Sequence, residues 1–357
     1  MKTVSRRNSS IELLKVLAVL LIIFSSAAPY GATYAGKGGV FIDLRLPTPT
    51  IQYAFFLACR WCGQIGDTLF ITCSAWFLCE SKSYRNEKIL LIIIASWVFS
   101  MAGLLIAFPF VSPSIREIIY SIFPITFKRN WFVGCYILYY AIHPFINKAI
   151  EDISSSTLSH ISLIITILYS VLSQFNPLFY FNDLIAFITI HILVTYCKKY
   201  RNDGLNDSLK NKLVILCFGF ILVWIVGITL FGSKVSFLQQ RGLQFCHYYN
   251  PTIIIASLCI VSLYAKQVWY SSIINRLSSY SLLIYLSHSN YFWLSYGKYY
   301  YYGWMVAHGI PILVSWVILV LIYAFISILL AEVFNHTVAK AVPVFYLKMS
   351  NITSHNK

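Results

Sequence analysis

The stretch NSSIELLKVLAVLLIIFSSAAP, residues 8–29, decides the class of protein to which this chain belongs. From Ile11 onward it is almost continuously apolar, over about the length that an α-helix needs to cross a bilayer. The run is longer than the ~7–15 apolar residues of a signal peptide. Glu12 and Lys15 also lie within its first turns. We therefore expect a membrane span that is retained in the mature protein.

The whole chain of 357 residues has the same character. Hydrophobic residues make up 59% of it and charged residues 11%, with a mean hydropathy of +0.71. Soluble proteins have about 45–50% apolar and about 25% charged residues. Two soluble domains, which the length allows, would leave large apolar areas exposed to water. The composition therefore predicts an all-α polytopic membrane protein, with residues 1–357 forming a single transmembrane domain.

Apolar runs recur along the chain and predict about ten transmembrane helices. The second, sixth and ninth runs are short or interrupted by polar residues, so that a re-entrant segment could replace one of them. Residues 49–62 are predicted to form an interfacial helix leading into the second span. The predicted spans are residues 11–30, 63–80, 88–108, 131–149, 157–174, 180–197, 212–232, 250–265, 279–296 and 309–333.

The charges indicate the orientation of these spans. The net charge of +15 comes from 27 Lys and Arg against 12 Asp and Glu. Basic residues fall in small groups between the apolar runs rather than on one face, so no nucleic-acid partner is predicted. With a cytoplasmic N-terminus, 17 of the 27 cations lie inside and 9 outside, while Lys15 lies within the first span. The positive-inside rule therefore predicts that both termini are cytoplasmic, in the inner (plasma) membrane.

Ionisable residues within predicted spans are candidates for function, because a charge in the bilayer costs a few kcal/mol. Glu12 and Lys15 are three residues apart on one helical face. This spacing fits an intrahelical ion pair, and it equally fits a contact of Lys15 with a phosphate or carboxylate. Asp67, early in the second predicted span, fits a helix cap better than a catalytic acid.

Three histidines also fall at membrane depth, namely His143, His191 and His288. A neutral histidine with a backbone partner is the usual outcome. His288 differs because it stands in the polar sequence Tyr-Leu-Ser-His-Ser-Asn, residues 285–290, within an apolar run. Such a cluster needs mutual hydrogen bonds or a water-filled cavity. Near neutral pH a histidine is also the natural proton carrier.

Two other patterns have ordinary interpretations. Cys59 and Cys62 form a CxxC pair, but no second pair or histidine cluster accompanies it, so no metal site is predicted. The tyrosine-rich stretch 296–302 fits an aromatic belt at the outer membrane boundary. Stacking of these rings against sugars is the alternative.

Four sequence blocks follow one another along the chain. They are Asn-Ser-Ser-Ile-Glu-Leu-Leu-Lys at 8–15, Gly-Asp-Thr-Leu-Phe at 66–70 with Ser-Ala-Trp-Phe-Leu at 74–78, Asn-Trp-Phe at 130–132 with Pro-Phe-Ile-Asn-Lys at 144–148, and Tyr-Leu-Ser-His at 285–288. The blocks cover nearly the whole chain, and each alone is weak. In this order they resemble the membrane-bound acyltransferases of the acyltransferase-3 type. This resemblance implies about ten spans and O-acetylation of surface polysaccharides.

The chain departs from the family at three positions. The family has an Arg near the start of the first span and a His three turns further along, where this chain has Lys15 and Ser26, with Ser25 adjacent. Ala75 replaces the Gly of a Ser-Gly pair. Lys15 keeps the positive charge without the bidentate guanidinium. Ser26 cannot hold a proton near pH 7 as imidazole does.

The resemblance implies acyl-CoA, most simply acetyl-CoA, as the donor. His288 is then the candidate base, with His143 second, and Ser26 and Asn290 are candidate hydrogen-bonding groups. Lys15, Lys82 and Arg85, with Lys88 as a further candidate, would contact the CoA phosphates. Residues 82, 85 and 88 share one face if the third helix starts early. The alternative is that these cations serve only the positive-inside bias.

The implied partners are a surface glycan or lipid-linked glycan acceptor and membrane lipids. The predicted function is therefore O-acyl transfer to a cell-surface polysaccharide such as O-antigen or capsule. Because Ser26 replaces the family histidine, a catalytically inactive relative acting in polysaccharide export or assembly is the alternative. A transporter with His288 in a proton relay is a third hypothesis, disfavoured because few spans are broken by Gly and Pro in corresponding halves.

Overall fold

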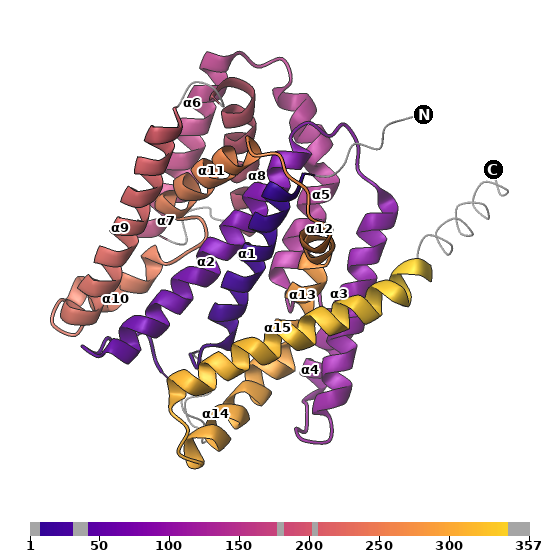
Figure 1. The fold of residues 1–357 in the computed structure, drawn as a ribbon, viewed down its shortest axis with the longest axis vertical. Coiled ribbons are helices and arrows are strands. Elements are labelled where there is room, and N and C mark those ends of the chain that lie inside the picture. Colours follow the sequence, from indigo (N-terminus) through magenta and orange to yellow (C-terminus); the bar gives the residue numbers. More distant parts are fainter. Residues whose placement is uncertain (1–7, 31–41, 177–181, 202–205, 342–357) are drawn as a thin grey trace.

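The computed structural model describes residues 8–30, 42–176, 182–201 and 206–341, and throughout this part of the chain it contains helices and no β-strand. The predicted all-α class is confirmed. The helices gather into one bundle, which α15 crosses obliquely (Figure 1). They are α1 (Ser9–Ala27), α2 (Ile51–Leu78), α3 (Asn86–Ala107), α4 (Ile115–Ile122), α5 (Trp131–Ile150), α6 (Ser155–Thr166), α7 (Leu172–Phe175), α8 (Asp183–Tyr196), α9 (Asp207–Phe231), α10 (Ser236–Arg241), α11 (Pro251–Ala265), α12 (Ser272–Ser279), α13 (Ser281–His288), α14 (Lys298–Ala307) and α15 (Ile312–His336). Short π-helices η1 (Ile167–Val171), η2 (Cys197–Arg201) and η4 (Trp293–Gly297) and the 3₁₀-helix η3 (Gly242–Phe245) complete the set.

Within the described residues, five helical segments are long and apolar enough to cross a membrane. A sixth apolar helix, α11, is shorter. The predicted count of ten spans and the cytoplasmic position of both termini stay predictions, and residues 1–7 and 342–357 lie outside the described part of the chain. The five segments are Ser9–Ala27, Asn86–Ala107, Ser155–Phe175, Asp207–Phe231 and Ile312–Ala341.

The second helix differs from its prediction. The expected interfacial helix at 49–62 is wrong, because α2 is one continuous helix of 28 residues. Its N-cap is Thr50, whose side chain accepts a hydrogen bond from the Tyr53 backbone N–H at 3.2 Å. No proline interrupts residues 51–78, so nothing stops the helix once it has begun. Asp67 therefore lies in the interior of α2, and its interpretation as a helix cap is also wrong.

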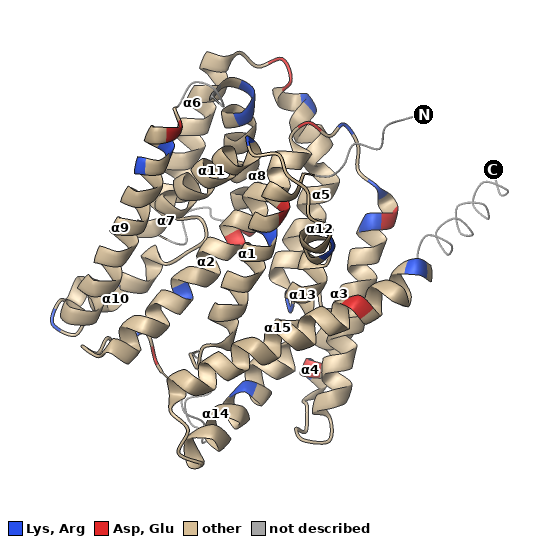
Figure 2. Ribbon diagram, in the orientation of Figure 1, with Lys and Arg blue, Asp and Glu red and all other residues tan. Residues whose placement is uncertain are grey.

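Charged residues concentrate at one end of the bundle. Figure 2 shows blue and red segments gathered where α2 ends and α3 and α9 begin, with scattered blue and red segments over the rest of the bundle. A polar end and an apolar middle suit a bundle whose helices share the bilayer as solvent. We call the end where α1 begins and α2 ends the basic end.

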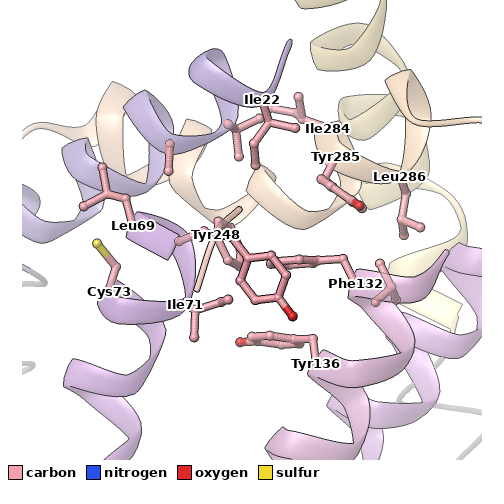
Figure 3. Packing of buried hydrophobic residues seen from close by; sticks show 14 of the residues in the cluster. Ile22, Leu69, Ile71, Cys73, Phe132, Tyr136, Tyr248, Ile284, Tyr285 and Leu286 are labelled. Atoms are coloured by element: carbon pink, nitrogen blue, oxygen red, sulfur yellow. The ribbon is translucent and has the colours of Figure 1, made fainter. Parts of the chain in front are cut away.

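Helix α1 lies at the centre and packs against α2, α11, α12, α13 and α15. Its first residue is tied to the segment before α12, since the Ser9 backbone N–H donates to the Trp269 carbonyl at 2.9 Å. Figure 3 shows Ile22 of α1 above an aromatic layer that includes Phe132 of α5 and Tyr285 of α13. The centroids of these last two rings are 5.0 Å apart. The centre of the bundle is therefore filled rather than a channel.

Two glycines let α1 and α2 approach closely. A Cβ atom on Gly66 would lie 2.5 Å from the Ala18 carbonyl oxygen, and one on Gly63 would lie 2.4 Å from the Ser25 Oγ. Small residues at such spacings are typical of tightly packed membrane helices, since no side chain holds the backbones apart. The contact runs from Ala18 to Ser25 and so fixes the second half of α1 against α2.

We predict that Gly66→Ala destabilises the protein by about 1–3 kcal/mol, because the new methyl group meets backbone that cannot move without separating the helices. The measurement is thermal unfolding of the purified protein in detergent. Gly219→Ala in α9 is the matched control, since a Cβ atom there meets nothing within 4 Å. An equal effect of the two substitutions would contradict this account of the α1–α2 contact.

Candidate active site

The predicted ninth span, 279–296, is a broken helix. Helix α13 ends at His288, and the chain resumes as a helix after Asn290. The Asn290 side chain makes two hydrogen bonds at the break. Its Nδ2 donates to the Phe99 carbonyl in the middle of α3 at 2.8 Å, and its Oδ1 accepts from the Phe292 backbone N–H at 3.0 Å. Gly103 makes room, because a Cβ atom there would lie 2.0 Å from that amide nitrogen. Asn290 therefore positions the break.

His288 lies at the end of α13 and is 2% exposed. Its Nδ1 is 2.7 Å from the Ile284 carbonyl oxygen, one turn back. A carbonyl only accepts hydrogen bonds, so Nδ1 carries the ring proton and Nε2 presents its lone pair. Among the described residues, Nε2 has no hydrogen-bond partner. His288 thus has the form of a general base whose acceptor atom is not used by the fold.

A cavity of about 640 Å³ lies beside His288. Its walls come from α3, α13, η4 and α15, and we call it the α3–α15 groove. Neither Lys15 nor Ser26 lines it. Lys15, Ser26 and His288, all predicted to belong to the site, therefore do not meet in this groove. The groove is lined by Phe99, Ala102, Gly103, Ile106, Ala107, Phe110, Val111, Ser287, His288, Asn290, Phe292, Trp293, Tyr296, Gly297, Tyr300, Ile322, Tyr323, Ile326, Ser327 and Leu330.

Lys15 lies near the basic end, and its Nζ is 3.5 Å from Glu12 Oε2, the ion pair that the spacing allows. Glu12 also accepts a hydrogen bond from the Ser278 hydroxyl of α12. The same ammonium lies 4.6 Å from the centroid of the Phe77 ring in α2. A second cation approaches from α3, where Lys88 Nζ is 4.4 Å from the centroid of a tyrosine ring of α5. Two lysines near the basic end, Lys15 of α1 and Lys88 of α3, therefore lie against aromatic rings of neighbouring helices.

Ser26 lies toward the other end of α1, about 16 Å from Lys15 along the helix axis at 1.5 Å per residue. Its carbonyl accepts a hydrogen bond from Lys298 Nζ at 3.3 Å. The neighbouring Ser25 hydroxyl is 2.5 Å from the Tyr30 hydroxyl. Lys298, only 5% exposed, also lies 5.4 Å from the Tyr299 ring centroid. The end of α1 is therefore a polar cluster with a buried ammonium group.

A second cavity, of about 490 Å³, opens at the basic end between the ends of α2, α5 and α8. Its four lysines are opposed by two glutamates, Glu80 and Glu151. We call it the lysine cavity. Ammonium groups on flexible stems are common ligands of phosphate. The cavity is lined by Cys79, Glu80, Ser81, Lys82, Pro144, Asn147, Lys148, Ile150, Glu151, Thr195, Lys198 and Lys199.

Of the predicted CoA contacts Lys15, Lys82, Arg85 and Lys88, Lys82 alone lines this cavity. Lys82 lies there, with Nζ 3.9 Å from Glu151. Arg85 does not; its Nε lies 3.8 Å from Glu87 and its side chain is largely exposed. Helix α3 begins at Asn86, so Lys82 stands outside the helix and the residues at 82, 85 and 88 do not share a helical face.

Two further histidines have structural partners. His191 lies between the Tyr139 hydroxyl, 2.7 Å from Nδ1, and Asn147 Oδ1, 2.7 Å from Nε2. His143 Nδ1 is 2.6 Å from the Tyr140 carbonyl oxygen, and its Nε2, like that of His288, has no hydrogen-bond partner among the described residues, but His143 does not line the α3–α15 groove. His191 thus joins α5 to α8 beneath the lysine cavity, as expected for a buried neutral histidine.

The amino-acid sequence of the chain matches a known protein family. The family described as "Acyltransferase domain" matches residues 8–335, nearly the whole chain. The chain belongs to the acyltransferase-3 family. The resemblance predicted from the four sequence blocks is confirmed, and with the apolar helices it makes the protein a membrane acyltransferase. Neither the curated proteins nor the solved structures contain a match to it.

Sequence reasoning overlooked several residues of this acyltransferase-3 protein. Lys148, Lys198 and Lys199 counted only toward the charge bias, and only the fold shows that they meet Lys82 around one cavity. Lys298 counted as an outer cation. The available signal was the position of this lysine within a tyrosine-rich run, because aromatic rings attract an ammonium group that is partly buried.

The buried ammonium of Lys298 gives the acyltransferase-3 protein a pH-dependent stability. Helix α14 lies outside the predicted spans, and burial lowers the pKa of Lys298 to about 8. The unfolded chain therefore binds more protons between about pH 8 and pH 10.4, so stability rises with pH in this window. We predict that the difference in Tm between wild type and Lys298→Met shifts by several degrees in favour of wild type from pH 7 to pH 10.

Thermal unfolding across this range checks the prediction, with Lys234→Met, an exposed lysine, as the matched control. The wild-type and Lys234→Met proteins should keep a constant difference in Tm. A pH-independent difference for Lys298→Met would mean that its ammonium is not buried.

Proposed function

We propose that this protein is an O-acyltransferase of the inner (plasma) membrane that transfers an acyl group, most simply acetyl, from cytoplasmic acyl-CoA to a hydroxyl of a cell-surface polysaccharide such as O-antigen or capsule. The observation that carries the proposal is the unused Nε2 of His288 beside a cavity in a chain of the acyltransferase-3 family. A base held ready for a proton is what acyl transfer to a hydroxyl requires.

In the proposed reaction His288 first accepts a proton and later donates it. Nε2 takes the proton of the acceptor hydroxyl while the oxygen attacks the thioester carbonyl carbon. The new C–O bond forms and the C–S bond breaks. The thiolate of CoA leaves and takes up the proton from His288, which restores the neutral imidazole. The products are the O-acyl ester and CoA.

The lysine cavity suits the phosphates of the donor. Lys82, Lys148, Lys198 and Lys199 stand at the basic end, which the positive-inside rule predicts to be cytoplasmic. Lys15 lies close by, because its ring partner Phe77 is two residues from Cys79, which lines the cavity. In this proposal the lysine cavity binds the nucleotide, and Lys15 adds positive charge further inside.

The end of α1 supports a role for Ser26 different from that of the family histidine. Its carbonyl binds the ammonium of Lys298, and Ser25 contacts Tyr30. Ser26 therefore helps to place a buried cation in the outer half of the bundle. The base itself comes from α13.

The test compares O-acetyl groups on the surface polysaccharide by NMR in wild type, a deletion strain, and strains carrying His288→Ala or His191→Ala. We predict that deletion and His288→Ala remove the acetyl signals. His191→Ala is the matched control, because it removes a buried histidine that already has two partners; at equal protein level it should retain acetylation. Equal acetylation in wild type and deletion strains would refute the proposed function.

The alternative function is export or assembly of the polysaccharide by a catalytically inactive relative. It is favoured because neither Lys15 nor Ser26 lines the cavity beside His288. The same strains separate the two. Export or assembly predicts that deletion changes the amount or length of the polymer while the acetyl content per sugar stays constant.

Lys82 and Arg85, two of the predicted CoA contacts, should respond differently to substitution. We predict that Lys82→Ala raises the KM for acetyl-CoA by roughly 3–10-fold, which is the effect of losing about one charge-assisted hydrogen bond. Arg85→Ala should change it less than twofold, since Arg85 lies outside the lysine cavity. Steady-state kinetics of the purified protein in nanodiscs measure both. A larger effect of Arg85→Ala would place the CoA phosphates elsewhere.

A further inference from the structure

The α3–α15 groove is far larger than an acetyl group. Its volume of about 640 Å³ has room for roughly twenty groups of the size of a water molecule, at about 30 Å³ each. An acetyl group has three non-hydrogen atoms. The groove must therefore accommodate something beyond the group that is transferred.

The walls of the groove are apolar. Ile106, Phe110 and Ile326 contribute strongly exposed side chains, and the polar side chains around them are largely used by the fold. Ser287 Oγ donates to the Ile284 carbonyl at 2.9 Å, and Asn290 holds the helix break. A sugar ring would leave its hydroxyls unpaired against such walls, which is costly. A hydrocarbon chain fits them without that cost.

Two buried polar atoms of the lining, His288 Nε2 and the Tyr323 hydroxyl, have no hydrogen-bond partner among the described residues. The Tyr323 hydroxyl can donate or accept a hydrogen bond, whereas His288 Nε2, with the ring proton on Nδ1, can only accept one. An unpaired buried acceptor costs about 1–3 kcal/mol, so a ligand that donates a hydrogen bond there gains on binding. A hydroxyl has such a proton. The acyl chain and carbonyl of a thioester have none, so a long acyl donor in the groove would leave Nε2 unpaired.

The position of the groove also favours an acceptor over a donor. Helix α3 begins at the basic end, and the groove is lined by its second half, from Phe99 to Val111. Its far rim is closed by Tyr296, whose hydroxyl donates to Glu117 of α4 at 2.9 Å. The lysine cavity lies at the opposite end of the bundle. A molecule in the groove therefore comes from the bilayer or the outer side.

We propose that the α3–α15 groove binds the hydrocarbon chain of a hydroxyl-bearing membrane lipid, whose hydroxyl donates to His288 Nε2. This deepens the proposed function and rests on it in one respect: the lipid is the membrane-embedded part of a lipid-linked precursor of the polysaccharide, and the hydroxyl that reaches His288 is the acyl acceptor. The transfer has the balance given above, with the oxygen of that hydroxyl forming the new ester bond and CoA leaving as the thiol. Binding itself does not depend on that transfer.

The experiment is photolabelling of the full chain in nanodiscs without acyl-CoA. The probes are hexadecanol with a diazirine in its chain and a terminal alkyne, the methyl ether of the same molecule, and the matching hexadecanoyl-CoA. The ether keeps the chain but lacks the donor proton. We expect the alcohol to label α3 and α15 peptides roughly 3–10-fold more than the ether, the effect of one hydrogen bond.

Three variants locate the site. Ala102→Trp fills the groove from an exposed position on α3 and should abolish labelling by alcohol and ether alike. Leu105→Trp is the matched control, because Leu105 is exposed on the same helix but does not line the groove; it should label as wild type does. His288→Ala should lower alcohol labelling to that of the ether while the labelled peptides stay the same.

Equal labelling by alcohol and ether in wild type would overturn the proposal, as would labelling that Ala102→Trp leaves unchanged. Stronger labelling of the groove by hexadecanoyl-CoA would assign it to the donor chain and would also overturn it. Failure of the proposed function is distinguishable: acetylation of the polysaccharide would be independent of the protein while the alcohol still labels the groove.

Discussion

The close contact between α1 and α2 is the constraint on which the remaining structure depends. Gly66 brings the α2 backbone against the Ala18 carbonyl of α1, and Gly63 leaves room for the Ser25 side chain. Helix α1 is thereby held at the centre of the bundle, and α5, α13 and the other helices pack around the pair. In a bilayer, where lipid and side chain are equally apolar, such packing replaces the hydrophobic effect as the force that fixes helix positions.

This packing separates polar groups that the resemblance to the family assigns to one site. Lys15 is tied to Glu12 at the basic end, and Ser26 faces Lys298 at the other end of the same helix. The proposed base, His288, lies instead at the end of α13, where it lines the α3–α15 groove. Broken helices are tolerated in membranes where side chains satisfy the freed backbone groups, and Asn290 does this here. The break thus creates both the cavity and the unused acceptor atom.

Much of the fold was predictable from the sequence, because apolar runs of helical length have few other stable forms in a membrane. The helix of residues 312–336 agrees closely with the predicted span. The predictions failed where the deciding contacts are between helices. Nothing local to Asp67 shows that its helix begins at Ile51, and nothing local to Asn290 shows that α3 supplies a carbonyl for its amide.

The same limit applies to the site. The polar run around residue 288 was visible because polar groups are rare in apolar spans. The lysine cavity was not, since Lys198 and Lys199 are far from Lys82 in sequence and look like ordinary positive-inside charge. Arg85, three residues from Lys82, faces away from the cavity. Spacing places residues on an element, and tertiary packing then decides which elements share a cavity.

The central claim is that donor and acceptor reach this membrane acyltransferase from opposite ends of the bundle. The most direct measurement uses sealed vesicles in which the orientation of the protein is determined by proteolysis of the α2–α3 loop. Labelled acetyl-CoA is added on one side and transfer to the polysaccharide acceptor is followed. The account predicts transfer in proportion to the protein whose basic end faces the acetyl-CoA. Transfer that is independent of orientation would contradict it.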